Sequence, residues 1–285
     1  MAVKTDYLVR SALTTDQQAL SHLIHFGPYV HRHLDWRNPV DWIGSSPYFV
    51  IQQNNELVGA LACPPDPPEI AWVRLFAITL DADLEQSWST LWDLAYQHLS
   101  RKRVPYAAII LLQDWFRDLL LSCGFVHHQQ IVMLEYHIPS LSSLNLPKSV
   151  AIEQMILSDI PAVVSVDKSA FPPLWQNSED ALRRAYAQAV SATVAKLNGD
   201  VVGYQISTRN SIGAHLARLA VKPEAQGTGV GSGLVTQMIS GLSQRGIHRV
   251  TVNTQSDNLT SLALYQKIGF HETNENYPVY QLSIA

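Results

Sequence analysis

The sequence predicts an α/β (α+β) chain with two domains built to one plan. Three observations lead to this prediction: an internal repeat, a hairpin signal, and a strand that runs through a glycine-rich turn into a helix and on to another strand. The hairpin implies antiparallel pairing and the crossover implies locally parallel pairing, so the sheet should be mixed. A length of 285 residues allows one large domain or two ordinary ones, and the repeat favours two.

The repeat consists of three short matches in the same order, at an offset of 144 to 145 residues. The matched pairs are Gly59 with Gly203, Arg74 with Arg218, and Gly124 with Gly269. Three ordered matches indicate a duplicated domain, whereas one would be chance. The boundary is expected near Ile138–Ser149, a stretch rich in Ser, Pro and Leu, which gives domains at 1–140 and 146–285.

Each element of the second half has a local signal. Asn198-Gly199 suits the positive φ angles of a type I′ turn between two strands, and Gly246 is placed to end a helix whose apolar residues recur at helical spacing. In the first half, the proline-rich Cys63–Pro68 is expected to be a turn between two strands. In order, the second half should hold a strand at Ser149–Met155, a helix opened by Asp159 and Pro161, a helix from Ser178 to about Val190, strands at Ala192–Leu197, Val201–Ser207 and Ala214–Val221, a helix at Gly229–Arg245, a strand at Arg249–Asn253, a helix at Leu259–Lys267 and a strand at Tyr280–Ile284.

Composition argues against several classes of partner. The formal net charge is −4 and no dense Lys/Arg run occurs, so no nucleic-acid partner is expected. The two cysteines, Cys63 and Cys123, form neither a disulfide framework nor a metal-ligand spacing, so no metal is expected. The first residues lack the apolar run of a signal peptide, and apolar segments such as Ala107–Leu112 are too short for a membrane span. We therefore expect a cytoplasmic protein without a membrane partner.

The segment Gln226–Gly233 holds four glycines between an expected strand and an expected helix. Glycine is costly at a helix start, so its use here needs a reason. Without Cβ atoms, the N–H groups of the first helical turn can approach an anion, which the helix dipole also attracts. The alternative is a flexible loop. The glycine spacing is neither the dinucleotide-binding fingerprint nor a P-loop.

Two motifs in the second half resemble those of the GNAT superfamily of acyl-CoA-dependent N-acyltransferases. Val221–Gly231 is similar to its motif Q/R-x-x-G-x-G/A, and Asn258–Phe270 is similar to N-x-x-A-x-x-L-Y-x-K-x-G-F, with Ser261 at the small position. The resemblance implies a tandem chain of two GNAT-like domains. Each would be a mixed, mostly antiparallel sheet flanked by helices, with a central parallel βαβ crossover.

The resemblance also implies a site for acetyl-CoA. Backbone groups of Leu219 and Val221 would bind the pantetheine arm, and Asn258 would contact the cofactor. The pyrophosphate would lie on the N–H groups of Gln226, Gly227, Thr228, Gly229, Val230, Gly231 and Ser232.

Two side chains are candidates for moving protons. Tyr265 falls at the position of the family's general acid, which protonates the departing thiolate; its alternative role is to pack its ring in the core. His215 falls where some members carry a glutamate base, and an imidazole with a pKa near 6.5 suits neutral pH, although an ordinary strand position is equally consistent. Arg218 is expected to be structural because Arg74 occupies the matching place.

The first half lacks the cofactor motif. The repeat offset places Ala82, Glu85 and Ser87 opposite Gln226, Gly229 and Gly231, in a turn where Asp81, Asp83 and Glu85 would repel a pyrophosphate. The place of Tyr265 falls at Leu120 or Leu121. We therefore expect a degenerate first domain, a layout similar to that of mycothiol synthases. The segment Phe171–Trp175 loosely resembles the acceptor-side loop of ribosomal-protein N-terminal acetyltransferases.

These observations predict an N-acetyltransferase that moves an acetyl group from acetyl-CoA to a primary amine of a small molecule or of a protein or peptide N-terminus. The alternative is a non-catalytic acyl-CoA-binding sensor or regulatory module. A nucleotide-binding oxidoreductase is disfavoured because the glycine spacing is wrong. The partners are an acyl-CoA and an amine acceptor, and the chain is expected to be a monomer or a homodimer. The acceptor itself is not encoded in these motifs.

Overall fold

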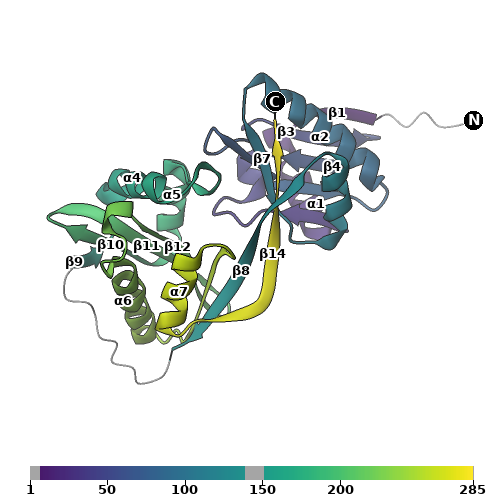
Figure 1. Ribbon diagram of the computed structural model, residues 1–285. Helices are drawn as coiled ribbons and strands as arrows, with labels where there is room; N and C mark the ends of the chain where they lie inside the picture. The colour runs from purple at the N-terminus through teal and green to yellow at the C-terminus, as the bar shows by residue number, and fades with distance from the viewer. Residues whose placement is uncertain (1–6, 139–150, 285) are drawn as a thin grey trace, which may run out of the picture. The chain divides into compact units, whose positions relative to one another are not determined.

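The computed structural model describes residues 7–138 and 151–284, which fall into two compact units (Figure 1). The first unit extends to His128 and includes the segment from Pro278 onward, and the second runs from Gln129 to Tyr277. The chain therefore passes between the units twice, within β8 (Val126–His137) and within β14 (His271–Ser283). The predicted boundary at 140–146 lies outside the described residues, so the division into 1–140 and 146–285 stays a prediction. The compact units, unlike that division, are not contiguous in the sequence.

The first unit contains a five-stranded sheet in the order β1-β3-β4-β6-β2, and a second group in which β7 lies between β5 and the end of β14. Its core is centred on aromatic side chains from α2, β6 and the turn before α3, including Trp88, Phe76 and Phe116. The elements are β1 (Tyr7–Ser11), α1 (Gln17–Phe26), β2 (Tyr29–Arg32), β3 (Tyr48–Gln53), β4 (Glu56–Ala62), β5 (Ile70–Trp72), β6 (Leu75–Ile78), α2 (Leu84–Arg101), β7 (Tyr106–Ile110) and α3 (Arg117–Ser122). The expected proline-rich turn at Cys63–Pro68 is confirmed, since it links β4 to β5.

The second unit contains strands in the order β14-β8-β13-β12-β11-β10-β9. Helices α4 and α5 cover one face of β10–β12, and α6 and α7 lie on the other (Figure 1). We call the first of these the α4 face. The elements are β9 (Ala151–Gln154), α4 (Ile160–Ala170), α5 (Glu179–Ala187), β10 (Ala189–Leu197), β11 (Asp200–Asn210), β12 (Gly213–Val221), α6 (Val230–Gln244), β13 (Arg249–Gln255) and α7 (Leu259–Ile268).

Local signals in the second half set most of these elements. Asn198 and Gly199 have φ angles of 53° and 90° and join β10 to β11, as the hairpin signal predicts. Ser178 caps α5 by accepting a hydrogen bond from the Ala181 N–H at 3.1 Å. Asp159 is the N-cap residue of α4 and Pro161 lies in the first turn, as predicted. The Asp159 carboxylate, however, accepts from the Ile156 N–H at 2.9 Å, so it closes the preceding 3-10 turn and makes no bond to the N–H groups of α4.

The internal repeat recurs in the strand pairing. Strand β12 pairs in parallel with β13 through Ala214 and Val250, and β5 pairs in parallel with β7 through Ile70 and Tyr106. Both partners of the first pair lie 144 residues beyond those of the second. The two units therefore share one plan with a parallel crossover, which confirms the predicted fold class.

None of the helices within residues 7–138 and 151–284 combines the length and the apolar character that a membrane span requires.

Candidate functional site

The candidate site begins where β12 and β13 separate. The two strands pair only from Ala214 to Leu216, and Ala217 then interrupts the register between β12 and β11. We call the divergence beyond Leu216 the splay. The Lys222 N–H donates to the Val202 carbonyl on β11 at 2.8 Å. Because successive residues of a strand direct their peptide groups to alternate sides, those of Val221 and Leu219 face the splay. Pantetheine would need such an edge of peptide groups without a strand partner.

The glycine-rich segment forms the end of the splay. Gly227 and Gly229 have φ angles of 75° and 92°, and a Cβ at either position would meet no atom within 4 Å. Glycine is therefore required here by the left-handed backbone and not by crowding. The Gln226 side chain donates to the Val221 carbonyl at 3.0 Å, which ties the loop back to β12.

The N-terminus of α6 is available to an anion. Gly229 is the N-cap residue and provides no side-chain acceptor for the first-turn N–H groups. Val230 anchors the turn because its side chain is buried between β10, β11 and α6. Thr228 directs its hydroxyl to the Ala225 carbonyl at 2.7 Å, while the segment Gln226–Thr228 is exposed. The geometry fits a phosphate group held by backbone N–H groups.

Helix α7 carries Asn258 and Tyr265. The Asn258 side chain caps the helix by accepting from the Ser261 N–H at 3.2 Å, which leaves its amide N–H groups and one lone pair of its oxygen for a contact with the cofactor. Tyr265 is buried against Phe270, with ring centroids 5.6 Å apart, in the apolar layer between α6, α7 and the sheet. Burial raises the pKa of Tyr265 above its usual value, so the phenol keeps its proton at neutral pH.

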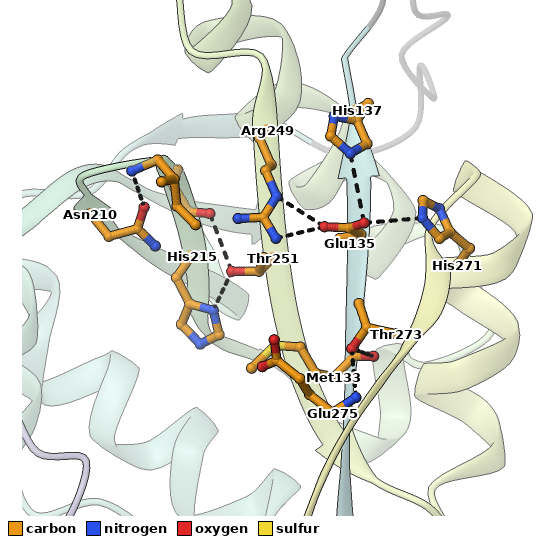
Figure 2. Close-up of polar contacts among 12 residues, drawn as sticks. Met133, Glu135, His137, Asn210, His215, Arg249, Thr251, His271, Thr273 and Glu275 are labelled. Carbon is orange, nitrogen blue, oxygen red and sulfur yellow. Dashed lines mark hydrogen bonds and ion pairs between the residues drawn. The ribbon is translucent and has the colours of Figure 1, made fainter.

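His215 lies on the α4 face, opposite to Tyr265. Its neighbours Ala214 and Leu216 pack with α6, and its Nδ1 lies 2.9 Å from Thr251 Oγ1 (Figure 2). Burial lowers the pKa of His215 to about 4, because the charged imidazolium is poorly solvated there. The imidazole is therefore neutral near pH 7, as a base must be, but it is a weaker base than its ordinary pKa of about 6.5 suggests.

Glu135 on β8 is a second possible proton acceptor on this face, two strands from His215. Arg249 donates to its Oε2 from Nη2 at 2.7 Å and from Nε at 2.9 Å, and His271 Nε2 lies 3.3 Å from Oε1 (Figure 2). The hydrogen bond from Arg249 lowers the pKa of Glu135. A carboxylate held in this way is a poor proton acceptor, which leaves His215 as the better placed candidate.

A buried ion pair beside the splay was only partly visible in the sequence. Arg218 Nε donates to Asp167 Oδ2 at 2.7 Å, and the Tyr204 hydroxyl donates to the same oxygen at 2.5 Å. In the first unit, Arg74 pairs with Asp35 at 3.0 Å and its guanidinium lies over the Trp42 ring. The structural role expected for Arg218 is thus repeated in both units. Asp167 and Tyr204 were missed because their partners are distant in sequence.

In the first unit, the strand edge and the helix N-terminus that correspond to this site already have partners within the unit. Phe76 and Ile78 on β6 correspond to Leu219 and Val221, since Ile78 pairs with Gly59 as Val221 pairs with Gly203. Their outer edge is paired with β2, in a register that joins His31 to Phe76 and Tyr29 to Ile78.

The N-terminus of the equivalent helix, α2, is also occupied. The Asp83 carboxylate accepts a hydrogen bond from the Gln86 N–H at 2.8 Å. The acidic turn thus places a carboxylate at the helix end where α6 presents a glycine.

Comparisons with known proteins agree with this geometry. Residues 160–270 match the acetyltransferase (GNAT) family. The chain is 30% identical over 139 residues to a mycothiol acetyltransferase of Amycolatopsis mediterranei, a match that covers 42% of this chain and 46% of that protein. It is 26% identical over 121 residues to the [ribosomal protein bS18]-alanine N-acetyltransferase of Escherichia coli, covering 42% of this chain and 80% of that protein.

A solved structure extends the likeness to the whole fold. A tandem GNAT protein from the clavulanic acid biosynthesis pathway aligns with a TM-score of 0.65 at 15% identity, over 99% of each chain. The two-domain fold is therefore a tandem GNAT fold. The chain spans about half the length of the mycothiol acetyltransferase that it matches.

Proposed function

We propose that this chain is an N-acetyltransferase of the acetyltransferase (GNAT) family, whose pattern residues 160–270 match, and that it uses acetyl-CoA. The acceptor would be a primary amine of a small molecule or of a protein or peptide N-terminus, which attacks the thioester directly. One observation carries the proposal: in the second unit, the open strand edge at Leu219 and Val221 leads into a helix N-terminus without a side-chain cap. Such a pairing fits an extended arm that ends in a pyrophosphate.

Each part of the site has a role in this proposal. Bound acetyl-CoA would supply the acyl thioester. Leu219 and Val221 would hold the pantetheine arm, and the N–H groups from Gln226 to Ser232 would hold the pyrophosphate. Positioning of the two substrates would provide most of the rate enhancement.

The two proton transfers, one to the leaving thiolate and one from the amine, would take place on opposite faces of the sheet. Tyr265, protonated at neutral pH, would donate to the leaving thiolate from the side of α7. His215 would accept the amine proton on the α4 face, where Thr251 orients its ring. A His215→Ala enzyme whose pH–rate profile matches that of the wild type would remove His215 from this scheme.

The alternative is a non-catalytic acyl-CoA-binding module. The packing of Tyr265 against Phe270 supports it, since a buried tyrosine can serve the core alone. The two functions are separated by mixing the protein with acetyl-CoA and a panel of primary amines and peptides, and detecting free thiol. Amine-dependent thiol release supports the acetyltransferase, whereas acetyl-CoA binding without release supports the sensor.

A further inference from the structure

The segment Phe171–Asn177, which links α4 to α5, is held against β12. Arg218 Nη2 donates to the Trp175 carbonyl at 2.6 Å, and the guanidinium carbon lies 3.6 Å from the centroid of the Phe171 ring. The same arginine pairs with Asp167, which is fully buried and also accepts from the Asn177 N–H at 2.8 Å. One buried ion pair therefore fixes both ends of the segment, and its geometry is costly to disturb.

The other attachment of this segment runs through the Trp175 side chain. Its Nε1–H donates to Gln129 Oε1 at 2.8 Å. Gln129 Nε2 in turn donates to the Asp257 carboxylate at 3.2 and 3.3 Å, next to the residue that caps α7. We call the chain of contacts Arg218–Trp175–Gln129–Asp257 the Trp175 bridge.

The Trp175 bridge crosses the splay. In the sheet order, β13 lies between β8 and β12. Arg218 lies just past the last β12–β13 pair, at Leu216, and Gln129 lies just past the last β8–β13 pair, at Ile131. A residue that bonds to both must pass over the end of β13 on the α4 face. Helices α6 and α7 cover the opposite face, so the face of the splay that they leave uncovered is the α4 face, where this bridge lies.

We propose that the Trp175 bridge fixes the opening through which the acceptor amine reaches the acyl group, with Trp175 and Gln129 as positioning residues. The inference rests on the proposed acetyltransferase function. It extends that function to the acceptor side of the site. There, the hydrogen bond from Trp175 to Gln129 on β8 would hold the Phe171–Asn177 segment over the splay.

The first test needs no substrate. Trp175→Phe removes the donor and keeps an aromatic ring, and Gln129→Leu removes the acceptor at similar volume. Hydrogen–deuterium exchange of residues 171–177 in the full chain should rise about 3- to 10-fold in either variant, as expected for one lost hydrogen bond. Because Gln129→Leu already breaks the bond that Trp175→Phe breaks, together with the bond to Asp257, the double variant should exchange no faster than Gln129→Leu alone. Unchanged exchange, or additive effects, would overturn the bridge.

Gln130→Leu is the matched control. Gln130 is the next residue on β8, and its amide donates to Asn276 at 2.7 Å, away from the segment. It should leave exchange at 171–177 at the wild-type level. An equal rise in this variant would mean that general loosening of β8, and not the bridge, controls the segment.

The second test uses whichever primary amine of the panel supports thiol release. Trp175→Phe and Gln129→Leu should raise the KM for the amine several-fold while kcat and the affinity for acetyl-CoA stay near wild type. A KM equal to that of the wild type overturns the acceptor role. If the wild type releases no thiol with any amine, the acetyltransferase proposal fails and the acceptor role fails with it, whereas the exchange data still decide whether the bridge exists.

Discussion

At the residue scale, two side chains proposed to move protons lie on opposite faces of one sheet. Tyr265 is enclosed by the apolar layer under α7, and His215 lies beside Thr251 on the α4 face. Burial moves both pKa values in the direction that keeps each group neutral at pH 7. A neutral phenol can donate a proton and a neutral imidazole can accept one, so the environment matches each residue to its proposed role.

Replacing Tyr265 tests the acid directly. Tyr265→Phe should lower kcat by about 100-fold, as is typical for loss of a general acid, and leave the affinity for acetyl-CoA nearly unchanged. Steady-state thiol release and calorimetric titration measure the two quantities. Tyr136→Phe is the matched control, since Tyr136 stacks on the same Phe270 ring at 5.2 Å. Wild-type turnover in the Tyr265 variant would take this residue out of the mechanism.

A buried histidine makes the first unit sensitive to acid. His31 is 1% exposed, its Nε2 lies 3.1 Å from the Val73 carbonyl, and burial lowers its pKa to about 4. In the unfolded chain the pKa is about 6.5, so the unfolded state binds more protons between these values. The free energy of unfolding should therefore have its full value above pH 6.5 and should fall by about 2 to 4 kcal/mol as the pH drops to 4.

This pH dependence is measurable by urea titration with tryptophan fluorescence, because all tryptophans except Trp175 precede residue 116. His31→Gln keeps a donor near the Val73 carbonyl but does not titrate, so its stability should depend less steeply on pH. His128→Gln, at an exposed position, should leave the slope unchanged. An equal slope in the wild type and the His31 variant would contradict the assignment.

At the element scale, α6 and α2 differ at the N-terminal end, where the proposed phosphate site of the second unit lies. Helix α6 follows β12, which pairs in parallel with β13, and α2 follows β6, which comes directly after β5, the strand that pairs in parallel with β7. The two helices therefore occupy the same place in the repeat. Gly229 opens the end of α6 with a left-handed residue, whereas Asp83 closes the end of α2 with its own carboxylate. The left-handed backbone at Gly229 therefore makes the start of α6 sensitive to substitution.

Gly229→Ala tests this backbone requirement. An alanine at a φ of 92° costs about 1–2 kcal/mol, so the turn should shift and the affinity for acetyl-CoA should fall about 10-fold. Gly241→Ala lies in the same helix in open space and should bind acetyl-CoA like the wild type. Calorimetric titration compares the two variants. Equal affinities would show that the loop does not hold the pyrophosphate.

At the scale of the whole molecule, one unit should bind acetyl-CoA and the other should not. Strand β2 already fills the edge of β6 that corresponds to the open edge of β12. Titration should give one acetyl-CoA per chain. Hydrogen exchange should show new protection at Leu219 and Val221 and none at Phe76 and Ile78. Two sites per chain, or new protection on β6, would contradict the assignment of a single site.

Each half of the chain contributes a strand to the other unit, through β8 and β14. Residues 279–283 of β14 pair with β7 in the first unit, and residues 131–137 of β8 pair with β13 in the second. Fragments 1–140 and 146–285 should each be insoluble or unfolded when expressed alone, because each lacks a strand of its own sheet. Expressed together, they should recover a folded protein by circular dichroism. Two independently folded fragments would show that the exchanged strands are dispensable.

The sequence by itself determined the features that depend on neighbouring residues. The Asn198-Gly199 hairpin, the helix end at Gly246 and the glycine-rich turn before α6 follow from backbone preferences that act over a few positions. The repeat offset was also readable, because three matches kept their order. These signals were sufficient to predict the fold class, and they place the proposed cofactor loop before α6.

Only the tertiary structure decided the features that depend on pairing between distant segments. The filling of the first unit's edge by β2, the pKa of His215, the Asp167–Arg218 pair and the Trp175 bridge all join residues whose separation in sequence carries no period or motif. Burial and long-range hydrogen bonds arise only once the sheet is assembled, since they depend on which strand lies beside which. For this reason the acidic turn at Asp81–Glu85 could be recognised in the sequence, whereas the pairing of β2 with the edge of β6 could not.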